Sequence, residues 1–226
     1  MPAPLELVEV APTATHDATV IWLHGLGASG HDFEPIPPLL GLPNTRFVFP
    51  HAPYRRVTIN FGMEMRAWYD ILTLDRTGVR EKAADIREAS EQVSALIADE
   101  RAKGIPAERI VLAGFSQGGA MALHVGLRHP ETLAGIMVLS AYELLAETRE
   151  AEAHVANATT PVMLAHGEQD PVVPVWLGEA ARDALRGADP QGHRPLEWHT
   201  YPMQHEVCPD ELRQIATWLH ARIGPG

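Results

Sequence analysis

A serine set among glycines is the residue in this sequence best suited to nucleophilic chemistry. Ser116 is the centre of a Gly-x-Ser-x-Gly pattern, GFSQG, which follows an apolar run and precedes a helical segment. A serine on a tight strand-to-helix turn adopts strained backbone geometry, and glycines are needed where side chains would collide with neighbouring backbone. The pattern alone also fits a structural turn, but the strand before it and the helix after it favour a nucleophile.

An acid and a histidine that could complete a catalytic triad follow Ser116 in the chain order serine, acid, histidine. Asp170 comes just after the apolar run PVMLA, and His205 comes just after the run LEWHTY. His205 would take the proton of Ser116 and later donate it to the leaving group, while Asp170 would fix the imidazole tautomer. The competing candidates are Glu168, which is the nearest rival acid, and the more peripheral Asp183, Asp189, His199 and His220.

A glycine-rich loop, HGLGASG at residues 24–30, could supply hydrogen bonds to an oxyanion. Backbone N–H groups of such a loop and of the residue after the nucleophile stabilise tetrahedral intermediates. We therefore expect Leu26 and Gln117 to be the two donors. The same glycines also fit the G-x-G-x-x-G pattern of a dinucleotide site, but no acidic residue in a matching βαβ unit accompanies them.

Alternating strands and helices would position these residues. Short apolar runs predict strands, and amphipathic or capped segments predict helices. Such alternation favours an α/β fold with a largely parallel sheet, in which every βα turn lies at the carboxyl edge where ligands bind. The predicted strands are Ala18 to Leu23, Arg46 to Phe49, Arg109 to Ala113, Leu133 to Leu139, Pro161 to Ala165 and Leu196 to Tyr201; the predicted helices are Glu81 to Lys103, Gly118 to Arg128, Val175 to Arg186 and Pro209 to Arg222.

Composition narrows the class of protein. The 226 residues, 46% apolar and 21% charged and without an evident linker, predict a single globular domain over residues 1–226. The formal charge of -11 argues against nucleic acid as a partner. Neither a signal peptide nor a run of about 20 apolar residues is evident, so we expect no stable membrane insertion. The single cysteine, Cys208, cannot form an internal disulfide and fits a cytoplasmic location.

Several ordered motifs together resemble the phospholipase/carboxylesterase family, which includes bacterial carboxylesterases and acyl-protein thioesterases. They are HGLG at residue 24, GFSQGG at 114, HGEQDPVVP at 166 and EWHTYPMQHEVCPDEL at 197. The resemblance implies an α/β-hydrolase fold, with a mostly parallel central sheet covered by helices on both faces. A further motif, VTIN at 57–60 with MRAWYDI at 65–71, resembles the flexible segment that borders the acyl channel. By that resemblance Trp68 and Tyr69 would line the substrate groove and Asp70 would anchor the segment, although an aromatic pair flanked by apolar residues is also typical of a core. Val172 is a further expected substrate contact.

These residues predict a serine carboxylesterase that acts through an acyl-enzyme intermediate, on esters of short to medium acyl chains, without metal or cofactor. The alternative within the family is acyl-protein thioesterase or lysophospholipase activity on longer chains. A non-catalytic binding protein on the same fold would not need Ser116, Asp170 and His205 together. A peptidase would usually carry an added domain, and a dienelactone-type hydrolase would have cysteine at the elbow. The family also includes dimers, so a homodimer is consistent with the resemblance.

Overall fold

A seven-stranded sheet forms the centre of the molecule. The structure is a computed structural model that describes residues 4–75 and 78–224. The strand order is β1-β3-β2-β8-β9-β10-β11, and every neighbouring pair is parallel except β1 with β3. The strands are β1 (Leu7–Val10), β2 (Ala18–Leu23), β3 (Thr45–Pro50), β8 (Ile110–Phe115), β9 (Gly135–Leu139), β10 (Val162–Gly167) and β11 (Leu196–Tyr201).

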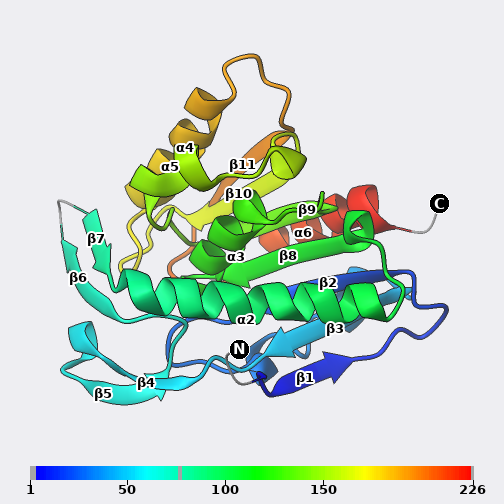
Figure 1. Ribbon diagram of the computed structural model, residues 1–226, viewed down its shortest axis with the longest axis horizontal. Coiled ribbons are helices and arrows are strands. Elements are labelled where there is room, and N and C mark those ends of the chain that lie inside the picture. The colour runs from blue at the N-terminus through cyan, green and yellow to red at the C-terminus, as the bar shows by residue number, and fades with distance from the viewer. Residues whose placement is uncertain (1–3, 76–77, 225–226) are drawn as a thin grey trace.

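Helices cover both faces of this sheet, as Figure 1 shows for α2 in front and α6 behind. One apolar core lies between the sheet and α2, α3 and α5, and a second core lies between the sheet and α1 and α6. This arrangement confirms the predicted α/β-hydrolase fold class. The helices are α1 (Pro37–Leu40), α2 (Ala83–Ala102), α3 (Gln117–Arg128), α4 (Arg149–Glu152), α5 (Val175–Ala188) and α6 (Pro209–Ile223).

Burial explains why these segments adopt these structures. All six residues of β2 are buried, as expected for a central parallel strand whose two faces are both covered. In α6 the buried residues Ile215, Trp218, Leu219 and Ile223 recur at helical spacing and form one apolar stripe against the sheet. Within the described ranges, no helix combines the length and the apolar composition needed to cross a bilayer.

Two small antiparallel hairpins lie outside the central sheet, at one end of the molecule (Figure 1). The first joins β4 (Tyr54–Val57) to β5 (Met63–Arg66), and the second joins β6 (Ile71–Asp75) to β7 (Gly78–Glu81). The sequence predicted neither hairpin. Because β7 occupies residues up to Glu81, the helix expected to begin there begins instead at Ala83, in α2.

Candidate active site

Ser116 lies in the tight turn between β8 and α3. Its backbone has φ 53° and ψ -123°, a conformation that residues other than glycine rarely adopt. The glycines on either side are required by close packing, because a Cβ on Gly114 would lie 2.3 Å from Gly118 and a Cβ on Gly118 would lie 2.3 Å from Leu23. The turn therefore holds the serine at the amino terminus of α3, where the helix dipole favours negative charge.

The fold brings Ser116, Asp170 and His205 together, although they are far apart in the sequence. The distance between Nε2 of His205 and Oγ of Ser116 is 2.9 Å. The distance between Nδ1 of the same ring and Oδ2 of Asp170 is 2.6 Å. This geometry lets the imidazole accept the hydroxyl proton while the carboxylate stabilises the resulting positive ring.

The Asp170 carboxylate is held in its ionised form by the loop that follows β10. Burial opposes ionisation, but hydrogen bonds from His205 and from the backbone N–H groups of Val173 and Val172 outweigh it, so the pKa of Asp170 is lowered. Both backbone N–H groups donate to Oδ1 at 2.8 Å. His166 supports the same loop, since its Nε2 donates to the Val173 carbonyl at 2.8 Å and burial lowers its pKa.

The glycine-rich loop after β2 lies beside Ser116, and Leu26 lines the same cavity as Ser116 and Gln117. Among the hydrogen bonds between described residues, none uses the backbone N–H of Leu26 or of Gln117 as donor. His24 fixes the loop. Its Nε2 accepts the N–H of Ala52 at 3.0 Å, so Nδ1 carries the proton and donates to the carbonyl of Gly25 at 2.7 Å. Burial lowers the pKa of His24 to about 4, which keeps the ring neutral.

An apolar cavity of about 140 Å³ opens onto Ser116. It is bounded by the loops of the site and by the hairpin β6–β7. Val172, one of the expected substrate contacts, is in its wall. The other wall residues were not singled out from the sequence, although Ile59, Asn60, Ile71 and Val173 lie within motifs that carry the family resemblance; Leu74, Val79 and Tyr142 lie outside any motif.

The structure places Trp68 and Tyr69 in the core next to the site. Both side chains are fully buried, and neither is among the residues that line the cavity. The amide of Gln117 binds this segment on both sides, accepting from the N–H of Trp68 at 2.7 Å and donating to the carbonyl of Tyr69 at 2.8 Å. The indole N–H of Trp68 donates to the carbonyl of His24 at 2.9 Å. These residues support the site from the core.

Asp70 ties the two hairpins together. Its carboxylate accepts the backbone N–H of Thr58 at 2.7 Å and the Thr58 hydroxyl at 2.8 Å. Its own N–H donates to Asp85 at 3.2 Å, at the start of α2. The geometry therefore agrees with an anchoring role for Asp70.

Comparison with known proteins decides the family. Residues 6–223 match the family model described as Phospholipase/Carboxylesterase. The chain belongs to the phospholipase/carboxylesterase family. It is 38% identical to acyl-protein thioesterase 1 of Mycosarcoma maydis, covering 95% of this chain and 93% of that protein. It is 41% identical to acyl-protein thioesterase 1 of Neurospora crassa, covering 95% of this chain and 90% of that protein. The structure of Zea mays acyl-protein thioesterase 2 superposes with a TM-score of 0.86 at 29% identity, covering 97% of this chain and 99% of that one.

Membership in this family makes the protein a carboxylic ester hydrolase. The alternative of a non-catalytic binding protein on the same fold is therefore not supported. Across residues 4–75 and 78–224, no three histidine, cysteine or carboxylate side chains gather in a way that could hold a metal ion.

A buried carboxyl lies just beyond the histidine loop of this family member. Glu211, in the first turn of α6, is completely buried, and neither carboxyl oxygen has a well-formed hydrogen bond among the described residues, although the nearby backbone N–H of Cys208 favours the ionised form. Burial outweighs this contact and raises the pKa of Glu211 to about 8. The folded protein thus keeps a proton that the unfolded chain has lost, so this group reduces stability as the pH rises from about 4.5 to about 8.

Replacement of Glu211 by glutamine is therefore expected to have a pH-dependent effect on stability. Glutamine imitates the protonated acid, so the Tm should change little at pH 5. At pH 9 the wild-type protein is destabilised, because a carboxyl that the unfolded chain ionises readily must be ionised in a buried position. E211Q removes this cost and should raise the Tm by about 5 °C or more. Thermal unfolding at both pH values measures this, with the exposed neighbour Asp210→Asn as control. An equal Tm difference at pH 5 and pH 9 would contradict the buried, protonated state.

Proposed function

We propose that this family member is an acyl thioesterase that also hydrolyses oxygen esters, with Ser116 as nucleophile and a short to medium acyl chain in the adjacent cavity. Three relatives named acyl-protein thioesterase 1 are 38%, 39% and 41% identical over almost the whole chain, which favours thioesters over simple esters as the physiological substrates. By the same similarity, the thiol that is released would be a cysteine of an acylated protein or peptide.

The proposed reaction has two half-reactions. Oγ of Ser116 attacks the carbonyl carbon while Nε2 of His205 accepts its proton, and the backbone N–H groups of Leu26 and Gln117 stabilise the oxyanion. Collapse of this intermediate breaks the bond to sulfur or oxygen, and His205 returns the proton to the leaving thiol or alcohol. Water, activated by the same ring, then hydrolyses the acyl-enzyme and releases the carboxylic acid. Asp170 stabilises the imidazolium in both halves.

The observation that carries this proposal is the apolar cavity that opens onto Ser116. Its walls from Ile71, Leu74 and Val79 offer no charge to a substrate, so they suit a hydrocarbon chain. A volume of about 140 Å³ is close to that of a cavity that holds benzene, so about six carbons fit without movement of the hairpin β6–β7. Longer chains would require that hairpin to shift.

A matched series of substrates tests the proposal. Thioesters and oxygen esters with the same acyl groups, from acetyl to palmitoyl, would be compared by kcat/KM. We expect a maximum near hexanoyl to octanoyl, with thioesters cleaved at least as fast as the matched esters. A thiolate leaves more readily than an alkoxide, so thioesters depend less on proton donation by His205. Turnover of esters without detectable turnover of thioesters would refute the thioesterase assignment.

Filling the cavity is expected to shorten the preferred acyl chain. The substitution Leu74→Trp places a larger side chain in the wall, so kcat/KM for octanoyl substrates should fall about tenfold or more while acetyl substrates are spared. Thr73→Trp is the matched control, because Thr73 is the exposed neighbour on β6 and does not line the cavity. An equal loss for acetyl and octanoyl substrates in L74W would contradict the placement of the acyl chain.

A further inference from the structure

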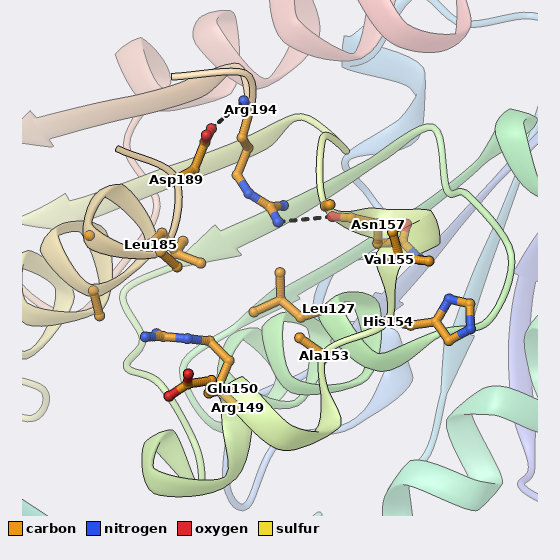
Figure 2. Close-up of a pocket in the computed structure, with 14 residues that line it drawn as sticks. Leu127, Arg149, Glu150, Ala153, His154, Val155, Asn157, Leu185, Asp189 and Arg194 are labelled. Carbon is orange, nitrogen blue, oxygen red and sulfur yellow. Dashed lines mark hydrogen bonds between the residues drawn. The ribbon is translucent and has the colours of Figure 1, made fainter. Parts of the chain in front are cut away.

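A second cavity, of about 750 Å³, lies away from the catalytic residues. It is open to solvent and lies between the end of α3, the segment from α4 through residues 155–157, and the carboxyl end of α5 (Figure 2). None of Ser116, Asp170 and His205 lines it. Its volume is several times that of the acyl cavity and lies within the range of about 300–1,000 Å³ that is usual for small-molecule sites.

Arg194 brings a positive charge to this cavity. Its guanidinium donates to the carbonyls of Thr160 at 3.0 Å and Asn157 at 2.8 Å. The nearby Asp189 carboxylate binds the backbone N–H of Arg194, at 2.6 Å, rather than its guanidinium. Among the ion pairs of the described residues, none includes Arg194. Burial lowers the pKa of Arg194, and the negative charge of Asp189 partly offsets this effect. The protonated guanidinium therefore lies within electrostatic range of Asp189 but makes no direct ion pair with a carboxylate among the described residues.

A second guanidinium faces the same cavity. Arg149 pairs through Nη1 with Glu143, at 2.7 and 2.8 Å, which leaves its other N–H donors available. Its charge also disfavours the charged form of Arg194, which shows that the two groups lie within electrostatic range of each other. Two guanidinium groups with unused donors suit a carboxylate or a phosphate, whose oxygens they bind in pairs.

The rest of the cavity wall suits the apolar part of a ligand. Figure 2 shows the side chains of Leu127 and Leu185 between those of Arg149 and Arg194. The carboxylates Asp189 and Glu150 also line it, but Asp189 is already bound to backbone N–H and Glu150 is exposed. We propose that this cavity binds an organic oxyanion, a carboxylate or phosphate carried on an apolar chain, at a site separate from the catalytic one.

Calorimetric titration of the whole protein with four probes tests this site. Octanoate and octyl phosphate combine an oxyanion with an apolar chain, whereas 1-octanol lacks the anion and inorganic phosphate lacks the chain. We expect both amphiphilic anions to bind, and the two partial probes to bind about tenfold more weakly or worse. The ratio of octanoate to octyl phosphate affinity then tells whether a carboxylate or a phosphate is preferred. Equal binding of 1-octanol and octanoate would overturn the proposal.

Substitutions at the cavity test whether the anions bind there. Arg194→Gln should weaken octanoate and octyl phosphate about tenfold or more, whereas Arg213→Gln, which removes the same charge from the exposed surface of α6, should leave the affinity unchanged. If R194Q fails to fold, Ala188→Trp fills the cavity from the end of α5 without removing either arginine, and it should block binding. Octanoate bound only in the acyl cavity would be insensitive to both changes, and that result would refute the second site.

Discussion

Replacement of Ser116 by alanine is expected to lower kcat by about 10⁶-fold for both thioesters and oxygen esters. Alanine has no Oγ, so the atom that lies 2.9 Å from Nε2 of His205 is lost and no acyl-enzyme can form. The oxyanion donors and the acyl cavity remain, which leaves a small residual rate. Turnover of a chromogenic octanoyl ester, with a thermal melt to verify folding, measures the effect.

Ser140 provides a matched control for this substitution. It is also a buried serine with positive φ, 48°, just after a strand of the same sheet, but it does not line the acyl cavity. Ser140→Ala should therefore retain kcat within a few-fold. If S116A kept a rate close to that of wild type, or if S140A lost as much as S116A, Ser116 would not be the nucleophile.

The substitution Asp170→Asn is expected to lower kcat by about 10⁴-fold, the size of effect seen when a triad aspartate becomes an amide. The amide oxygen can still accept the N–H groups of Val172 and Val173, so the loop keeps its shape. Its NH₂ group, however, donates toward Nδ1 of His205 and favours the tautomer that cannot take a proton from serine. The rate should fall with little change in KM.

A carboxylate outside the site controls for loss of charge. Asp183 lies exposed on α5 and pairs with Arg182, so Asp183→Asn removes the same charge without touching the triad. We expect D183N to keep wild-type kcat. Comparable losses in D170N and D183N would mean that the effect is electrostatic and general, whereas full activity of D170N would remove Asp170 from the mechanism.

Most strands of the central sheet could be predicted, because a strand that is buried on both faces appears as an unbroken apolar run. The run at Ala18 to Leu23 coincides with the fully buried β2. Leu196 to Tyr201 coincides with β11 although none of its residues is fully buried, and the short edge strand β1 was not predicted. Parallel strands then place Ser116, Asp170 and His205 at one edge, so their order along the chain was enough to expect that they meet. The distances from the His205 ring to Asp170, 2.6 Å, and to Ser116, 2.9 Å, come only from the structure.

The two hairpins could not be predicted, because the strands β4 to β7 are short, pair only within their own hairpin and have few buried residues. β5 reads MEMR and none of its residues is fully buried, so it shows no apolar period. The sequence left two interpretations of Trp68 open, a core residue or a substrate contact, and only the structure shows that its side chain is buried. Its position depends on the Gln117 amide, 49 residues away, which binds the backbone of this segment. The cavity beside Arg194 likewise arises from segments that no motif connects.

Covalent labelling tests directly whether Ser116 is the nucleophile. A serine-reactive fluorophosphonate would be incubated with the wild-type protein, and the adduct would be located by intact-mass and peptide mass spectrometry. Attack by Oγ on phosphorus expels fluoride and transfers the hydroxyl proton to His205, which imitates the first half-reaction. We predict one adduct per chain, on the peptide that carries Ser116, and none on S116A under the same conditions. Absence of an adduct on wild type, or an adduct on another residue that persists in S116A, would contradict it.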